Sequence, residues 1–232
     1  IINGHGSCDW SASGISIDTR TLNKGDIFFA FSGLNNDGND FIEDALNRGA
    51  CSAISNRPSL INSKKVIFVN DVYKALNELA NYARQRTKAK IIGITGSSGK
   101  TTLKEMISSC LIDYGRVHKS ERSFNNHLGV PLSLSRMPID VDYAVFEIGM
   151  NNKGEILKLT NLIKPHIGIV NNVGEAHIGN FNSKKDLIEE KLSIAKGIVD
   201  DGSLIINENL KSDLDINIIK NKSLNISTFG VL

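Results

Sequence analysis

The residue types best suited to chemistry lie in one glycine-rich segment. Residues 93–102 read Gly-Ile-Thr-Gly-Ser-Ser-Gly-Lys-Thr-Thr, between an apolar run and an amphipathic run. Glycines let successive backbone N–H groups point at an anion, and the N-terminus of a following helix adds partial positive charge. Lys100 would then reach the outer phosphates of a nucleotide, and the hydroxyl of Thr101 or Thr102 would hold Mg²⁺. The segment predicts a phosphate-binding loop. The strict pattern has glycine where Ile94 stands, and the alternative is an ordinary glycine-rich turn.

Other polar residues follow the apolar runs expected to form neighbouring strands. Glu147 ends the run 143–146, Asn171 and Asn172 end the run 167–170, and His177 comes shortly after. Ligands of an open parallel sheet bind beyond the carboxyl ends of its strands, so these side chains and the phosphate loop should converge. Carboxylate and phosphate oxygens suit a hard cation, whose shell imidazole could complete. Taken singly, Glu147 could instead be a capping or surface carboxylate, and His177 a surface or core histidine.

Lys191 falls within an apolar helical stripe. At about 100° per residue, the stripe consists of Leu187, Ile188, Leu192, Ala195, Ile198 and Val199. An inward lysine is costly unless it is paired or deprotonated. One interpretation is a lysine whose stem packs inside while its amine reaches water. The functional interpretation is an amine placed among metal and phosphate groups.

The elements that must position these residues alternate along the chain from residue 89. Apolar runs of strand type lie at 91–95, 143–148, 167–170 and 204–206. Amphipathic helices are expected at 100–114, 156–163 and 183–199, and the first should bury a face formed by Leu103, Met106, Ile107, Cys110 and Leu111. This alternation predicts an α/β fold with a mostly parallel sheet and helices on both faces.

The first 86 residues predict a smaller α/β domain. Short strands are expected at 15–17, 27–31, 53–55 and 66–69, and helices at 41–47 and from 71 onward. The second helix ends in the basic stretch 84–88, which suits a domain boundary. The predicted organisation is therefore a domain of residues 1–86 followed by one of residues 87–232. Residues 207–225 are expected to form a surface helix and loop, and 229–232 resemble a strand cut short, so we expect a fragment of a longer protein.

Composition narrows the class of protein. The chain has 232 residues, 41% hydrophobic and 22% charged, which is typical of a globular protein. A net charge of +2 is too small to predict a nucleic-acid or anionic-membrane surface. The three cysteines, Cys8, Cys51 and Cys110, form no CxxC pair, which favours a reducing cytoplasm over disulfides or zinc. No apolar run approaches the ~20 residues that span a bilayer. We expect a cytoplasmic monomer with no nucleic-acid partner and no membrane insertion.

Several segments together resemble the Mur ligase family. Segment 95–102 is similar to that family's variant of the phosphate loop, which lacks the first glycine. Further similar segments, in chain order, are 16–20, 25–30, 37–41, 123–131, 147–156 and 171–177. They cover nearly the whole chain. Segment 123–131, Ser-Phe-Asn-Asn-His-Leu-Gly-Val-Pro, is most similar to the family member that adds D-alanyl-D-alanine.

The resemblance implies an ATP-dependent ligase that joins D-alanyl-D-alanine to UDP-N-acetylmuramoyl-tripeptide through an acyl phosphate, in peptidoglycan precursor synthesis. It implies ATP contacts from Thr95, Gly96, Ser97, Ser98, Gly99, Lys100, Thr101, Thr102 and Asn172. Catalytic roles would fall to Lys100, Glu147, His177 and Lys191. The Mg²⁺ ligands would be Thr101, Glu147, His177 and Lys191, the last as a carbamate. The substrate would be bound by Ser16, Asp18, Thr19 and Arg20 near its uridine diphosphate, and by Asn125 and Asn126 near its pyrophosphate and sugar.

The chain departs from the family pattern at three points. Ser123 stands where asparagine is usual, and His127 where an acidic residue is frequent. The resemblance also implies a Rossmann-like third domain that closes on ATP and binds the incoming amine, and we expect no counterpart of it within these 232 residues. Alternatives therefore stay open: a ligase of the third-position amino acid, a folate or cyanophycin-type ligase, a nucleotide switch, or an inactive fragment that binds nucleotide. Residues 124–126 argue against a ligase of the third-position amino acid. The resemblance of the first domain to a uridine-nucleotide domain argues against a folate or cyanophycin-type ligase. A GTPase switch would need Asn-Lys-x-Asp, but 152–155 and 221–224 both lack the aspartate.

Overall fold

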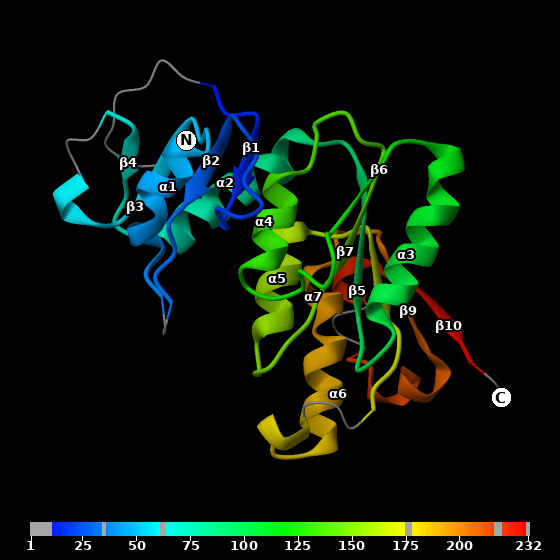
Figure 1. Ribbon diagram of the computed structural model, residues 1–232. Helices are drawn as coiled ribbons and strands as arrows, with labels where there is room; N and C mark the ends of the chain where they lie inside the picture. Colours follow the sequence, from blue (N-terminus) through cyan, green and yellow to red (C-terminus); the bar gives the residue numbers. More distant parts are fainter. Residues whose placement is uncertain (1–10, 34–35, 61–63, 175–177, 216–219, 231–232) are drawn as a thin grey trace. The chain divides into compact units, whose positions relative to one another are not determined.

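The computed structural model describes residues 11–33, 36–60, 64–174, 178–215 and 220–230 (Figure 1). The chain forms two compact units, residues 1–82 and 83–232. The division falls inside helix α2 (Val72–Arg86), four residues before the boundary expected from the basic stretch. The described part of the chain contains no helix long and apolar enough to cross a membrane.

The first unit is built on a parallel sheet in the order β1-β2-β3-β4. Its strands are β1 (Gly14–Ser16), β2 (Asp26–Phe29), β3 (Ser52–Ser55) and β4 (Val66–Phe68). Its short helices are the 3-10 helix η1 (Gly38–Phe41), α1 (Ile42–Asn47) and the 3-10 helix η2 (Pro58–Leu60). Small and apolar side chains from β2, β3, β4 and α1 form one core cluster, which lets α1 pack closely on the sheet.

The second unit contains a six-stranded parallel sheet in the order β10-β9-β8-β5-β7-β6. Its strands are β5 (Lys90–Thr95), β6 (Val117–Lys119), β7 (Tyr143–Glu147), β8 (Ile167–Val170), β9 (Ser203–Asn207) and β10 (Asn225–Phe229). Its helices are α3 (Lys100–Leu111), α4 (Gly129–Ser135), α5 (Glu155–Ile163), α6 (Lys184–Leu192) and α7 (Ile194–Gly197). The 3-10 helices are η3 (Ile112–Tyr114), η4 (Ile178–Asn180) and η5 (Glu208–Asp213). The predicted α/β fold class is confirmed.

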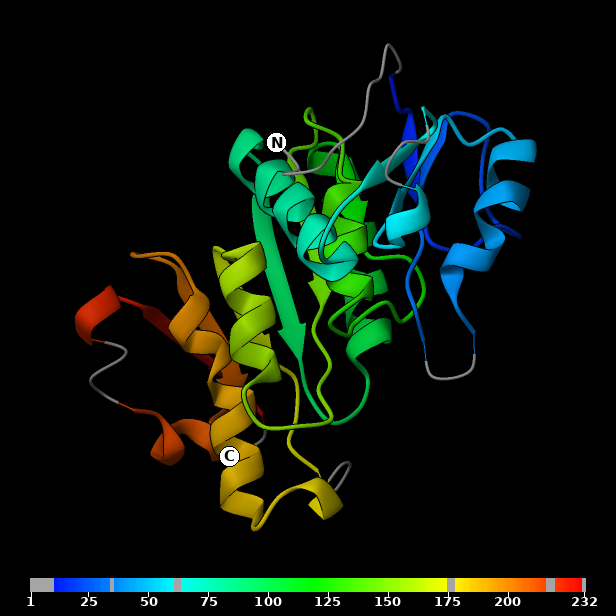
Figure 2. The same cartoon turned by 90° about the vertical axis from the view of Figure 1, so that its left-hand side faces the viewer.

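Helices cover both faces of this sheet, with α3 on one side and α4, α5 and α7 on the other (Figures 1 and 2). The central strand β5 explains the arrangement, because successive side chains of a strand point to opposite faces. Ile92 and Ile94 pack in one cluster with the α3 residues Leu103 and Ile107. On the other face, a Cβ added at Gly93 would lie 3.2 Å from the Ile163 side chain of α5. A glycine here therefore lets α5 approach the sheet.

The prediction of one helix at 183–199 is wrong in one respect, because this segment forms two helices. α6 ends at Leu192, and α7 starts after Ser193. The Ser193 hydroxyl donates to the backbone oxygen of Glu190 at 2.5 Å. Serine side chains that bond to the preceding turn compete with the regular helix ladder, which accounts for the break.

The buried face expected for α3 is confirmed in part, because Leu103, Ile107 and Leu111 pack against the core cluster of the sheet. Met106 is 61% exposed and Cys110 is exposed, whereas Lys104 and Ser108 are buried. On a helical wheel Lys104 lies between Leu111 and Ser108, so the true buried face is rotated away from the apolar stripe. Strand β6 and helix α4 were not predicted at all. The described part of 207–225, expected to form a surface helix and loop, contains the 3-10 helix η5 and helical residues at 220–222.

Two histidines predict how stability depends on pH. Burial lowers the pKa of His118, whose Nε2 lies 2.9 Å from the Ser133 oxygen. Burial, then the charges of Arg84 and Lys90, lower the pKa of His166, whose Nδ1 accepts from the Ile91 N–H at 2.9 Å. Both pKa values lie below the unfolded value, so the unfolded chain binds protons more readily. The stabilisation is complete above about pH 6.5 and is lost as pH falls through the folded values.

We expect urea titrations at pH 7.5 and 5.5 to show this loss, at about 1.4 kcal/mol per unit of pKa difference. The variants His118→Gln and His166→Asn remove the titrating ring, so each should reduce the difference in unfolding free energy between the two pH values. Carboxylates also titrate in this range, and the wild-type chain measured in parallel corrects for them. An unchanged pH difference in both variants would contradict the assignment.

Candidate active site

The glycine-rich segment forms the predicted strand–loop–helix structure. β5 ends at Thr95, and α3 begins at Lys100. Gly99 has φ +73°, a left-handed conformation that favours glycine, and an added Cβ there would lie 2.9 Å from the Asn171 side-chain nitrogen. The Lys100 ammonium donates to the Gly96 oxygen at 2.9 Å, so it lies across the loop. This arrangement brings a glycine-containing loop, a lysine and a helix N-terminus together, the combination on which phosphate-binding loops are built.

Asn172 contacts the loop itself. Its Oδ1 accepts from the N–H groups of Ser97 and Ser98 at 3.0 and 2.9 Å, and its Nδ2 donates to Ser98. The neighbouring Asn171, which also follows β8, donates from Nδ2 to the Ser98 oxygen at 2.9 Å. The end of β8 therefore fixes the loop directly. Thr102 lies exposed in the first turn of α3, and Thr95 is buried at the end of β5.

Glu147 lies beside the phosphate loop, as the sheet topology predicts. It is 2% exposed at the end of β7. Its Oε2 accepts from the Thr101 hydroxyl at 2.7 Å, and its Oε1 accepts from the Asn125 amide at 2.7 Å. The backbone oxygen of Asn125 in turn accepts from the Gly149 N–H at 2.7 Å. A hydroxyl and a carboxylate thus meet at the loop.

This donor set fits a hard cation that takes its remaining ligands from phosphate and water. Mg²⁺ prefers oxygen ligands and is usually held by one or two carboxylates together with substrate phosphates. Glu147 and Thr101 supply a carboxylate and a hydroxyl at the mouth of an anion-binding loop. Among the residues that the structure describes, no group of three or more His, Cys, Asp or Glu side chains could hold a metal alone. His177 lies outside the described residues.

Lys191 points inward, as its place in the apolar stripe predicts. It is 1% exposed, on α6, whose N-terminus is capped by Ser183. Burial and then the nearby charge of Lys100 lower the pKa of Lys191 to about 8, while Glu190 acts in the opposite direction. A lysine with this pKa carries a substantial neutral fraction near neutral pH. It therefore has nucleophilic character that a surface lysine lacks.

One cavity of about 330 Å³ brings several of these residues together. Its walls include Lys100, Asn125, Asn126, Glu155 and Lys191. Glu147 adjoins it through its bond with Asn125. Asn126 also caps α4, because its Oδ1 accepts from the Gly129 N–H at 2.8 Å. The predicted residues of the second unit that the structure describes therefore lie in or next to one site.

Two further carboxylates, not predicted as site residues, lie near this cavity: Glu155 lines it, and Glu190 holds α5. Glu190 is buried, and it accepts from the N–H groups of Gly154 and Ile156 at 2.7 and 3.0 Å, which fixes the start of α5. Glu155 accepts from the Asn151 N–H at 2.7 Å and so holds the preceding turn. The signal for Glu190 was its position next to an inward lysine on an amphipathic helix.

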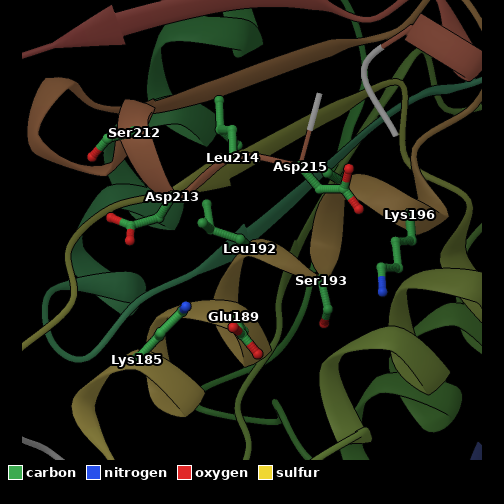
Figure 3. Close-up of a pocket in the computed structure, with 10 residues that line it drawn as sticks. Lys185, Glu189, Leu192, Ser193, Lys196, Ser212, Asp213, Leu214 and Asp215 are labelled. Carbon is green, nitrogen blue, oxygen red and sulfur yellow. The ribbon is translucent and has the colours of Figure 1, made fainter. Parts of the chain in front are cut away.

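A second cavity, of about 410 Å³, lies between α6, α7 and η5 (Figure 3). Lys185 and Lys196 contribute positive charge to it, and Glu189 and Asp213 negative charge. None of the predicted site residues lines it. Because its charges are mixed and the phosphate loop does not reach it, the smaller cavity is the candidate active site.

In the first unit, Ser16, Asp18, Thr19 and Arg20 form one turn after β1. The Ser16 hydroxyl donates to the Asp18 backbone oxygen at 2.9 Å. Arg20 pairs with the Asp18 carboxylate at 2.6 Å, and this bond lowers the pKa of Asp18 to about 2. Thr19 is buried, whereas the Arg20 side chain is 84% exposed. The turn thus presents a cation, while its buried members hold its shape.

Comparison with known proteins gives consistent matches. A family model described as the Mur ligase middle domain matches residues 94–232, more than half of the chain. A second, described as the Mur ligase family, catalytic domain, matches residues 11–99. The UDP-N-acetylmuramoyl-tripeptide--D-alanyl-D-alanine ligase of Rickettsia prowazekii is 41% identical over 219 residues, which are 93% of this chain and 49% of that protein. Its namesake from Bacillus subtilis is 39% identical over 194 residues, 83% of this chain and 42% of that protein.

Solved structures agree with these matches. A crystal structure of MurF from Acinetobacter baumannii has a TM-score of 0.85 at 31% identity, covering 99% of this chain and 51% of that one. MurF ligase from Thermotoga maritima in complex with ADP has a TM-score of 0.78 at 28% identity, covering 94% of this chain and 50% of that one. The chain thus spans about half the length of these relatives. The chain belongs to the Mur ligase family.

Proposed function

We propose that the full-length protein is an ATP-dependent ligase that joins D-alanyl-D-alanine to UDP-N-acetylmuramoyl-tripeptide. The names of the relatives support this reaction, and MurF of Thermotoga maritima in complex with ADP supports the nucleotide. The observation that carries the proposal is one cavity that holds Lys100 and Lys191, next to Thr101 and the buried Glu147. That combination suits a triphosphate placed beside a carboxylic acid.

The chemistry explains why such a site is needed. A carboxylate does not react usefully with an amine, but an acyl phosphate does, because phosphate is a competent leaving group. ATP supplies the phosphoryl group that activates the carboxylate. The protein must bring two anions together, and its contribution is positioning and charge neutralisation. Lys100 and the N–H groups of the loop would bind the outer phosphates, and this keeps the reacting groups in line.

Mg²⁺ and a modified lysine belong to the same proposal. Thr101 and Glu147 would hold Mg²⁺ on the phosphate side, and Glu147, His177 and Lys191 would serve a second ion. Addition of CO₂ to the neutral amine of Lys191 would convert an ammonium into an anion able to bind metal. The lowered pKa of Lys191 supports this modification, because only the neutral amine reacts with CO₂.

The first unit would bind the acceptor substrate. We propose that residues 1–86 bind its uridine nucleotide through Ser16, Asp18, Thr19 and Arg20, and that residues 87–232 bind ATP. Asn125 and Asn126 would lie near the pyrophosphate and sugar, since both line the cavity. Cys51 and Cys110 are free thiols, which suits the reducing cytoplasm where ATP is available, and we propose a monomer there.

This function is tested by measuring which substrates the full-length protein needs in order to release phosphate from ATP. We expect phosphate release by the full-length protein to require both UDP-N-acetylmuramoyl-tripeptide and D-alanyl-D-alanine. The corresponding dipeptide should be a poor acceptor, and this comparison separates the proposed ligase from one that adds the third amino acid. Hydrolysis that is independent of both substrates would instead indicate a nucleotide switch.

Nucleotide binding without ligation is the second candidate, for the 232-residue chain taken alone. It is favoured because the chain spans about half the length of its relatives. The chain would then bind ADP with Mg²⁺ but form no amide with both substrates present. Amide formation by the isolated chain would remove this candidate.

A further inference from the structure

Lys104 is a fully buried lysine that the proposed chemistry does not use. It lies on α3 one turn after Lys100, and its exposed fraction is 0%. Its ammonium donates to the backbone oxygens of Ser120 and Arg122 at 2.7 and 2.6 Å, and it pairs with Glu105 at 3.3 Å. A buried charge is costly unless it is paired and hydrogen-bonded. Three donors here meet three acceptors, so the ammonium is fully satisfied.

The segment that Lys104 holds leads directly to the candidate active site. Ser120 is buried, and its hydroxyl accepts from the backbone N–H of Glu147 at 3.3 Å. Arg122 has φ +46°, a left-handed conformation unfavourable for a residue with a side chain. Its carbonyl is one of the two that Lys104 binds, so Lys104 helps to stabilise this conformation. Three residues later, Asn125 reaches the Glu147 carboxylate.

We propose that Lys104 is a positioning residue that fastens segment 120–126 to α3, so that Asn125 holds Glu147 toward Thr101. Its consequence for Mg²⁺ rests on the proposed function, but its consequence for the segment does not. Because α3 also carries Lys100, one helix would fix both the phosphate loop and the Asn125 segment. The distance between the nucleotide side and the Glu147 side of the site is then set by a single rigid element.

A purely structural role for Lys104 would lead to a different experimental result. Loss of a buried lysine that only fills the core would lower global stability and leave the folded site unchanged. Loss of a positioning residue would release segment 120–126 within the folded protein. Partners that orient metal ligands typically contribute about 10- to 100-fold in metal affinity, so Mg²⁺ dependence should also change.

The experiment compares Lys104→Met with Lys119→Met in the full-length protein. Methionine keeps much of the lysine volume but removes its donors. Lys119 also pairs with Glu105, yet it is exposed and holds none of the backbone oxygens of segment 120–126 among the described contacts, so it is a matched control. The first readout is hydrogen exchange of the Gly149 amide, which donates to the Asn125 oxygen. The second is the Mg²⁺ concentration that gives half-maximal enhancement of ADP binding.

We expect Lys104→Met to speed Gly149 exchange at least about tenfold under conditions where the fold is intact. The half-maximal Mg²⁺ concentration should rise about tenfold, with ADP binding in the absence of Mg²⁺ unchanged. Lys119→Met should match wild type in both. If Lys104→Met does not fold, Lys104→Gln, which keeps a neutral amide NH₂ on a shorter stem, is measured with the same expectation.

Unchanged Gly149 exchange in the folded Lys104 variant would overturn the proposal. The proposal would also be overturned if Mg²⁺ enhances ADP binding by the wild-type protein and the Lys104 variant has the same half-maximal Mg²⁺ concentration. If wild type binds ADP without any Mg²⁺ response, the proposed metal site fails, and the exchange result alone decides the role of Lys104. The double variant Lys104→Met/Asn125→Ala adds a check. If Lys104 acts through Asn125, the half-maximal Mg²⁺ concentration of the double variant should equal that of Asn125→Ala alone.

Discussion

Lys100→Ala in the full-length protein should lower turnover by about 10³-fold while the fold remains intact. Lys100 lies at the N-terminus of α3, with its ammonium over the phosphate loop and 2.9 Å from the Gly96 oxygen. In the proposed reaction, negative charge would accumulate there as the phosphoryl group moves toward a second anion. A fixed cation in a site screened from water acts more strongly than one in solvent, so its removal costs transition-state energy. Steady-state turnover with both substrates present measures the effect.

The control for this prediction is Lys158→Ala. Lys158 is an exposed lysine on α5, so this variant makes the same change in net charge without touching the loop. It should retain wild-type turnover. Thermal unfolding of both variants separates a loss of chemistry from a loss of folded protein. Near-normal turnover by Lys100→Ala would reject the assigned role, and equal losses in both variants would point to net charge instead.

The sequence predicted the centre of the site because strong local patterns and one topological rule coincide there. An apolar run, a glycine-rich turn and a lysine at a helix start define β5, the loop and α3 without any tertiary information. Glu147 and Asn172 then followed from the rule that parallel strands end at one edge of a sheet. The structure confirms that both side chains reach the loop. These predictions needed only the direction in which each strand runs. They succeed because the order of the strands in the sheet affects them only weakly.

What the sequence missed depends on contacts between distant segments. Lys104 looks like a surface residue on α3, and only the carbonyl oxygens of segment 120–126 explain its burial. Helix α4 contains glycine, proline and serine, so its formation depends on packing: six of its seven residues are buried. The helix break at Ser193 likewise needs a hydroxyl that turns back on its own helix. Each miss is a place where tertiary structure overrides local propensity.

The binding and catalytic roles of all the site residues stay proposals, whether or not the structure describes their positions. His177 lies outside the described residues, so the convergence predicted for it stays a prediction. The roles of Ser16, Asp18, Thr19 and Arg20 also stay proposals, although the turn they form is a well-defined one with a paired Asp18 and Arg20. In the proposed complex, the exposed Arg20 guanidinium would exchange part of its pairing with Asp18 for the nucleotide's phosphates.

The second large effect concerns Lys191. Lys191→Ala should lower turnover by at least about 100-fold, because it would remove both a cavity-lining group and the proposed carbamate ligand. Because burial and the charge of Lys100 lower the pKa of Lys191 to about 8, its buried amine is richer than that of an ordinary lysine in the neutral form that reacts with CO₂.

Chemical rescue distinguishes a carbamate from a plain ammonium at this position. Short carboxylic acids such as acetate would fill the space left in Lys191→Ala and supply the missing anionic oxygens, so turnover should recover in part and saturate with acid concentration. Methylammonium, which supplies a cation of similar size, should not restore it. Lys196→Ala, an exposed lysine on α7, controls for the loss of a nearby charge. Full activity of Lys191→Ala without additive would exclude the role. Rescue by methylammonium and not by the carboxylic acids would show that the site needs an ammonium. Lys191 would then not be the proposed carbamate ligand of the second Mg²⁺.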